Sequence, residues 1–390
     1  MYRFYYDESE HSRKINYDTI SASNYYDNFV SVIVGWPEEK EQDIFKKYLS
    51  FESTYSARKN KKGELKSDTL KQKQFNFGFA SMTRPNFQFL EDFFSLWDEE
   101  MHFYFFIASK IEYLILQLFA PYKNNPFINI SAMVYTITKA LVSYRPEKVL
   151  KCIYYSPESF VYVLKDFFRE RIEFNKKNIQ LKKEENQAFE GVLICLQNIS
   201  VIPILDWNYY MPFIGFHKYL SEEKITDYCL TIDKEGENSQ ESQTLQAAHS
   251  IGLHNTIEAD SLSTCGIRIA DMLAGIITKL LKALCDALRY HSLEEGTTKK
   301  LLDPRWFQIN EKQYALYKKL YEIVCEWDPA WYKSYAGIYS DDLTTFIALL
   351  GYMNRFESVK QIYASKLNMQ SEYFNGYVYE LLHQRFEEMK

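Results

Sequence analysis

The segment Asn28–Trp36, which reads NFVSVIVGW, most constrains the fold of this 390-residue chain. A strand with one face in water alternates apolar and polar residues, whereas Val32, Ile33 and Val34 place apolar side chains on both faces. The pattern predicts a strand that is buried on two sides. Residues 2–7 read as a second strand of the same kind.

Strands and helices alternate through the first part of the chain. Residues 37–51 begin with Pro37 and several glutamates and end with lysines, which is the charge order that the dipole of a helix favours. Residues 86–100 carry apolar side chains at helical spacing, and residues 101–109 read as a further strand. The alternation is typical of an α/β core.

Strand signals then fade and return later. Long helices are indicated from about residue 111 to residue 200, a strand is indicated again at residues 225–233, and residues 265–290 read as one long helix. We therefore predict an α/β core that is split by a helical insertion and followed by a helical C-terminal region. The predicted boundaries are 1–110 for the first part of the core, 111–200 for the insertion, 201–292 for the second part of the core and 293–390 for the C-terminal region.

Composition limits the setting in which the protein works. The N-terminus has no leader pattern, and no apolar run approaches the roughly 20 residues that a membrane-spanning helix needs. None of the six cysteines forms a Cys-x-x-Cys pair. We expect a cytoplasmic protein with reduced thiols and no membrane contact.

The overall charge and the local charge distribution point in opposite directions on nucleic-acid binding. The net charge of −6 does not indicate a nucleic-acid binder, because phosphate affinity depends on clustered lysines and arginines. One such cluster runs through residues 58–73, where seven basic residues accompany only two acidic ones. A run of this kind is more often a solvated loop. It is nevertheless the best candidate for contacting phosphates of DNA or RNA, through Lys61, Lys62 and Lys66.

Three acidic residues stand next to strongly apolar sequence. Asp7 ends the first strand, Asp233 ends the strand after the insertion, and Asp271 lies in the long helix among apolar residues. Because ligand sites in open α/β sheets favour strand ends, we expect the three acids to meet at one rim. Unpaired anions there would cost several kcal/mol each, and a divalent cation removes that cost.

Carboxylate ligands favour Mg²⁺ or Mn²⁺ over zinc. The seven histidines agree, since none of them forms a His-x-His or His-Glu-x-x-His pair. A two-ion carboxylate site activates water and stabilises the leaving oxygen in phosphodiester cleavage. The acids therefore favour a nuclease or a related phosphoryl-transfer enzyme.

Several of these residues have competing interpretations. Neighbouring side chains on a strand point to opposite faces, so Glu8 faces the same metal as Asp7 only if the strand end twists or bulges. Arg268 lies three residues before Asp271 on one helix face, where it neutralises that carboxylate in a structural ion pair or contacts a scissile phosphate. Asp233 alone is also consistent with a residue that starts a turn.

Two short motifs carry a family resemblance. FYYDES at the N-terminus, together with GIRIADMLAGII late in the chain, resembles the bacterial domain-of-unknown-function 3800 family, whose fold is similar to ribonuclease H. The resemblance covers about residues 1–110 and 200–292 and implies a ribonuclease H-like mixed sheet flanked by helices. It implies catalytic acids at Asp7, Glu8, Asp233 and Asp271, with metal ions on Asp7, Asp233 and Asp271.

The resemblance has further implications and one departure. It implies a Glu-x-Lys element, which Glu64 and Lys66 match, and the metal-dependent nuclease or integrase chemistry that ribonuclease H-like folds support. Where the family has Gln three residues before its helical acid, this chain has Arg268. An arginine there would compete with the cation for Asp271.

Two other function classes stay open. A phosphatase that uses Asp7 as nucleophile would need a second acid two residues later, where this chain has Ser9. The main alternative is a catalytically degenerate scaffold of a phage-defence system that binds a protein partner through the insertion or the C-terminal helices. The acidic net charge and Arg268 favour the scaffold, whereas the set of acids favours the enzyme.

Overall fold

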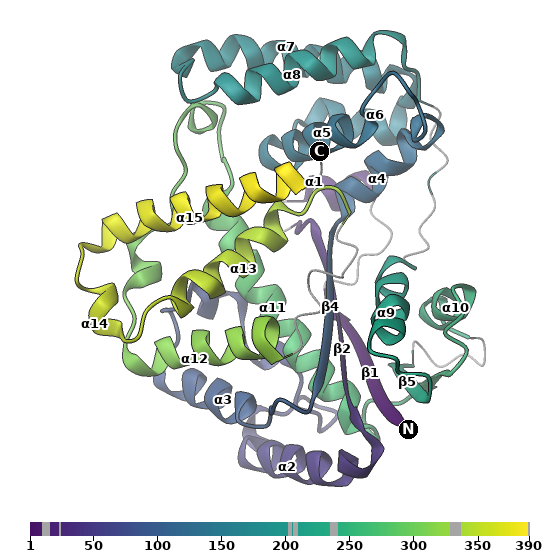
Figure 1. The fold of residues 1–390 in the computed structure, drawn as a ribbon, viewed down its shortest axis with the longest axis vertical. Coiled ribbons are helices and arrows are strands. Elements are labelled where there is room, and N and C mark those ends of the chain that lie inside the picture. The colour runs from purple at the N-terminus through teal and green to yellow at the C-terminus, as the bar shows by residue number, and fades with distance from the viewer. Residues whose placement is uncertain are drawn as a thin grey trace.

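A mixed five-stranded sheet forms the centre of the protein (Figure 1). The computed structural model describes residues 1–9, 16–22, 25–201, 205, 210–234, 241–327 and 337–388. The strands are β1 (Tyr2–Ser9), β2 (Asn28–Pro37), β4 (His102–Ser109), β5 (Tyr228–Asp233) and β6 (Thr256–Ala259), in the order β4-β2-β1-β5-β6. β2 is antiparallel to β1 and β4, whereas β5 is parallel to β1 and β6. The predicted α/β class is confirmed.

Strand β2 is buried from Asn28 to Trp36. Val32 packs in the core on one face of the sheet, and Phe29 and Ile33 pack in the core on the other. The prediction of two-sided burial is therefore correct. The four-residue β6 was not predicted, because so short a segment has too few residues to show a period.

One face of the sheet carries a thick helical layer. The long helix α11 packs on β1 and β2, and Gly266 at its start lets the ring of Tyr5 approach, since a Cβ there would overlap that ring. The C-terminal helices share this core with the sheet and are not a separate tail. The layer contains α2 (Glu41–Thr54), the short strand β3 (Asn76–Phe79), α3 (Arg84–Phe94), α11 (Cys265–Leu288), α12 (Glu311–Tyr321), α13 (Asp341–Asn354), α14 (Val359–Ile362) and α15 (Leu367–Glu388).

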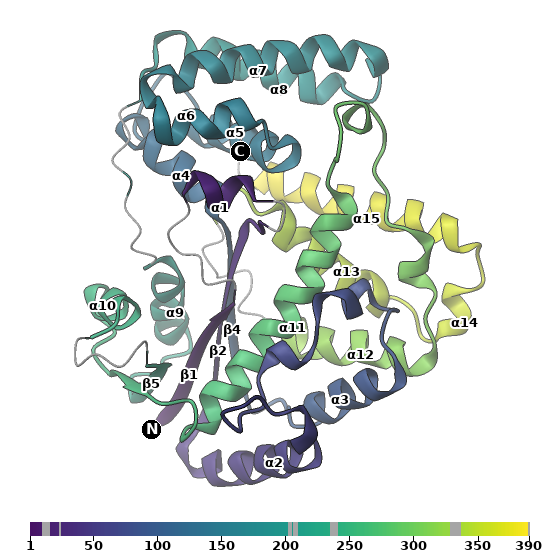
Figure 2. The same ribbon diagram turned by 180° about the vertical axis from the view of Figure 1, so that it is seen from behind.

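Two helices cover the opposite face, α9 (Met211–Glu222) and α10 (Gln243–Ser250). Phe216 of α9 packs edge-on against Phe4 of β1, with ring centroids 5.1 Å apart. The sheet therefore lies between two helical layers, as Figures 1 and 2 show from opposite sides.

The insertion forms its own helical unit with its own core (Figure 2). Its helices are α4 (Lys110–Leu118), α5 (Ile130–Tyr144), α6 (Glu147–Tyr155), α7 (Phe160–Asn175) and α8 (Lys183–Cys195), and α1 (Tyr17–Ser21) packs against α6. The helical character predicted for residues 111–200 is confirmed. All six cysteines are free. Among the helices that the structure describes, none has the length and apolar character required to cross a bilayer.

Candidate functional site

The parallel pairing of β1 with β5 brings two of the predicted acids to one edge of the sheet. Tyr6 pairs with Ile232, so Asp7 and Asp233 come next on adjacent strands. Asp7 lies on the face of the sheet that Tyr5 presents to α11, because alternate residues of a strand share a face. Its exposed fraction is only 8%.

Helix α11 supplies the third acid, Asp271. The backbone N–H of Ser67 donates to Asp271 Oδ2 at 2.7 Å, and the Ser67 hydroxyl donates to Oδ1 at 3.2 Å. Gly275, one turn later, permits this approach, because a Cβ there would lie 2.2 Å from the Cβ of Ser67. The segment before β3 therefore fixes the carboxylate of Asp271.

Asp7 and Asp271 affect each other electrostatically. Burial raises the pKa of Asp7 well above its ordinary value, and the nearby charges of Asp271, Asp233 and Glu8 raise it further, while the Glu8 N–H opposes them. Burial also raises the pKa of Asp271, although Ser67 and Lys66 oppose that change. The buried Asp7 and the half-buried Asp271 are therefore a pair of carboxyl groups with like charge.

Lys66 lies among these acids. Its Nζ is 3.9 Å from Glu64 Oε1 and 3.9 Å from Asp233 Oδ2. Burial opposes the charge on Lys66, but Asp271, Glu64, Asp233 and Asp7 together raise its pKa. We call Asp7, Glu64, Asp233 and Asp271 the acidic rim, and Lys66 supplies positive charge within it.

Ser261, which precedes α11, connects two members of the acidic rim. Its hydroxyl donates to Glu64 Oε1 at 2.8 Å, and its backbone N–H donates to Asp233 Oδ1 at 3.2 Å. These bonds hold the Glu-x-Lys element, which the sequence indicated only by resemblance, against the end of β5. Ser261 itself carried no signal in the sequence.

A tight turn presents two predicted phosphate-contacting lysines next to the acidic rim. The side chain of Asn60 accepts the backbone N–H groups of Lys62 and Glu64. Gly63 has a φ of +84°, a conformation that glycine adopts at little cost. Lys61 and Lys62 are exposed on this turn.

Glu8 lies on the opposite face of the sheet from Asp7. The hydroxyl of Tyr6 donates to Glu8 Oε2, and the ring of Tyr6 packs against Phe213 of α9. Strand alternation therefore separates Glu8 from the acidic rim, and its place among the catalytic acids is corrected. Ser9, which stands where a phosphatase would have its second acid, ends β1 opposite Val30.

Arg268 forms a structural ion pair, but not with the residue expected. Its Nε donates to Glu52 Oε1 of α2 at 2.7 Å, and the side chains of Arg268 and Glu52 are only 5% and 3% exposed. Its Nη1 donates to the carbonyl oxygens of Ser261 and Leu262. The predicted pairing with Asp271 is wrong, and the buried guanidinium is not placed to contact a substrate phosphate.

The donor set fits a divalent cation only in part. Within the ranges given above, no group of three or more His, Cys, Asp or Glu side chains is arranged to hold a metal ion. Asp7 and Asp271 still offer two hard oxygen donors, and Mg²⁺ is commonly held by one or two carboxylates plus waters and substrate phosphates. The three-acid, two-ion site stays a prediction.

Comparisons with known proteins find no match for this chain among protein-family models, curated proteins or solved structures. The resemblance to the domain-of-unknown-function 3800 family therefore rests on the two sequence motifs alone.

We expect Asp7→Asn to raise the melting temperature near neutral pH. The folded-state pKa of Asp7 lies above its unfolded value, so this group reduces stability as pH rises from about 4 through the folded pKa. Asparagine removes the charge, keeps an acceptor for the Glu8 N–H, and should add about 1–2 kcal/mol to the free energy of unfolding.

Melting temperatures of the wild type and the variant between pH 5 and 8 provide the test. The advantage of the variant should grow with pH. Asp43→Asn, at an exposed position of α2, is the matched control and should show no such growth. A variant that melts at or below the wild-type temperature throughout this range would contradict the assignment of Asp7 as a destabilising charge.

Proposed function

We propose that the acidic rim is the catalytic centre of a ribonuclease H-like phosphodiester hydrolase that acts on nucleic acid with Mg²⁺ or Mn²⁺. The observation that carries the proposal is the pairing of the buried Asp7 with the half-buried Asp271: burial, and after it the charge of Asp271, raises the pKa of Asp7. Glu52, by contrast, is neutralised by Arg268. A repelling pair lowers stability, and perturbed acids of this kind concentrate at functional sites.

The residues of the rim have distinct proposed roles. Asp7 and Asp271 would hold the divalent ion, with Asp233 as the candidate third ligand. The bound ion would supply an activated water and stabilise charge on the leaving oxygen. Lys66, whose ammonium lies 3.9 Å from both Glu64 Oε1 and Asp233 Oδ2, would neutralise a substrate phosphate that enters the rim.

The basic turn supports nucleic acid as the substrate class. Lys61 and Lys62 are exposed within five residues of Lys66, so a phosphate chain entering the rim would pass near three ammonium groups. Contacts of this kind give affinity without sequence specificity. The mixed sheet, with acids in the last residues of two adjacent strands and a third acid on the covering helix, supports the ribonuclease H-like interpretation.

Cleavage assays test this function directly. End-labelled single-stranded DNA, duplex DNA and single-stranded RNA are incubated with the protein in Mn²⁺, in Mg²⁺ and in EDTA. We expect cleavage of at least one substrate with metal and none in EDTA. Absence of cleavage of all three substrates with either metal would refute the proposal.

A non-catalytic scaffold is the second candidate, and the position of Lys66 favours it. An ammonium that already balances part of the acidic rim reduces the need for a bound cation. Melting curves separate the two candidates, because a ligand that binds only the folded state raises the melting temperature. An enzyme should show a Mn²⁺-dependent increase that Asp7→Ala removes, whereas a scaffold should show no increase.

A further inference from the structure

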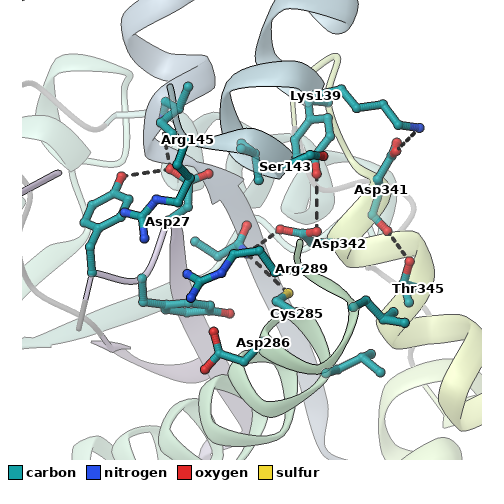
Figure 3. Close-up of a pocket in the computed structure, with 18 residues that line it drawn as sticks. Asp27, Lys139, Ser143, Arg145, Cys285, Asp286, Arg289, Asp341, Asp342 and Thr345 are labelled. Carbon is teal, nitrogen blue, oxygen red and sulfur yellow. Dashed lines mark hydrogen bonds and ion pairs between the residues drawn. The ribbon is translucent and has the colours of Figure 1, made fainter. Parts of the chain in front are cut away.

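A pocket with several charged lining residues lies near the end of α11 that is farther from the acidic rim (Figure 3). Its lining residue Cys285 is about 21 Å along the helix from Asp271, at 1.5 Å per residue. The cavity measures about 170 Å³ and is lined by the segment before β2, by α5 of the insertion, by the end of α11 and by α13. The core, the insertion and the C-terminal helices therefore all contribute to one pocket.

Two arginines line this pocket from different elements. Arg145 ends α5 with a φ of +46°, donates to the carbonyl oxygen of Ile20 at 2.9 Å and lies 4.6 Å from the ring centroid of Tyr25. Arg289 directly follows α11. Figure 3 shows both side chains in the pocket. Within the described part of the chain, neither guanidinium forms an ion pair with a carboxylate.

Three of the carboxylates that line the pocket already form hydrogen bonds or ion pairs with other groups of the protein. Asp27 accepts the Tyr25 hydroxyl at 2.8 Å and the N–H of Ile111 at 3.0 Å. Asp341 forms an ion pair with Lys139 at 2.8 Å. Asp342 accepts a hydrogen bond from the side-chain amide of Asn28 at 2.6 Å. Asp286 also lines the pocket and is exposed.

Arg145 and Arg289 lie close enough for their positive charges to affect each other. Burial lowers the pKa of Arg145, and the positive charge of Arg289 lowers it further. Tyr25, Asp27 and Asp286 act in the opposite direction but do not offset this effect. An anion between the two guanidinium groups would remove the repulsion between them.

We propose that this pocket binds a small phosphate-bearing ligand between Arg145 and Arg289. One guanidinium fork satisfies a single carboxylate, whereas a tetrahedral phosphate dianion offers oxygens to two forks that approach from different directions. The hydroxyl of Ser143 also lines the pocket. A cavity of about 170 Å³ is smaller than the roughly 300–1,000 Å³ of drug-sized sites, so the ligand is a small phosphomonoester or inorganic phosphate.

Phosphorus NMR titration tests the proposal, with inorganic phosphate and glycerol phosphate as probes and acetate as competitor at constant ionic strength. We expect saturable binding of at least one probe that acetate does not displace. Arg289→Gln should weaken binding about tenfold or more through loss of charge-assisted hydrogen bonds. Asp286→Asn should tighten binding about two- to fivefold, because it removes an opposing charge.

Arg84→Gln is the matched control, since Arg84 is exposed at the start of α3. It should bind the probes as the wild type does. Circular dichroism confirms that each variant is folded, and the opposite sign expected for Asp286→Asn keeps the test valid if Arg289→Gln does not fold. Unsaturable binding of both probes, or equal affinity in Arg289→Gln and the wild type, would overturn the proposal. Both outcomes are independent of cleavage at the acidic rim.

Discussion

Replacing Asp271 with asparagine is expected to lower metal-dependent cleavage at least about 100-fold, because a divalent ion contributes several kcal/mol to the transition state and each 1.36 kcal/mol is a factor of ten. The fold should tolerate the change. Asparagine can still accept the N–H of Ser67, and burial already opposes the charge on Asp271. Initial rates on the best substrate, measured with wild type and variant at equal Mn²⁺, give the ratio.

A control must distinguish loss of metal binding from loss of the folded state in Asp271→Asn. Melting of Asp271→Asn without metal should occur at or above the wild-type temperature, because burial opposes the charge of Asp271 and that charge repels Asp7, while its response to Mn²⁺ should fall. Glu8→Gln, which changes an acid on the opposite face of β1, should leave the cleavage rate close to wild type. Undiminished cleavage by Asp271→Asn would assign the activity to other residues.

Replacing Arg268 with methionine is expected to reduce the free energy of unfolding by about 3–5 kcal/mol, the usual cost of leaving one member of a buried ion pair without its partner. Glu52 would keep a buried negative charge with only the part-exposed Lys59, 3.1 Å from its Oε2, as a partner. The carbonyl oxygens of Ser261 and Leu262 would lose their donor. Urea denaturation of both proteins at pH 7 measures the difference.

The double variant Glu52→Leu with Arg268→Met distinguishes a structural pair from a phosphate-binding arginine. Removing both charges should restore most of the lost stability, since an apolar pair of similar volume often replaces a buried ion pair without loss. A double variant as unstable as Arg268→Met alone would show that the main contribution of Arg268 is not its pairing with Glu52.

The layered fold could be predicted because the signals for it are local. Two-sided burial is visible in the consecutive apolar residues of β2, and α11 is long enough to show its period. The partners of the C-terminal helices could not be predicted, because an apolar stripe does not specify which surface it covers. In the structure Phe346 packs over Phe105 of β4, which lies 241 positions earlier.

The candidate site also has a part that the sequence could predict and a part that it could not. Asp7 and Asp233 could be placed together from strand ends alone, because their backbones are adjacent once β1 and β5 pair. The partner of Arg268 could not be found, since Glu52 lies 216 positions away on a helix with no motif. The position of Lys66 within the acidic rim also depends on tertiary packing, which the spacing of residues along the sequence does not reveal.

The shared core of the sheet and the C-terminal helices has a consequence during synthesis. Strands β1 and β2 leave the ribosome first, but α11, α12 and α13, which cover one of their faces, are translated after residue 264. The insertion can bury its own apolar residues much earlier. We therefore expect the nascent chain to carry an incompletely covered apolar surface until α11 is made, and to be prone to aggregation during that time.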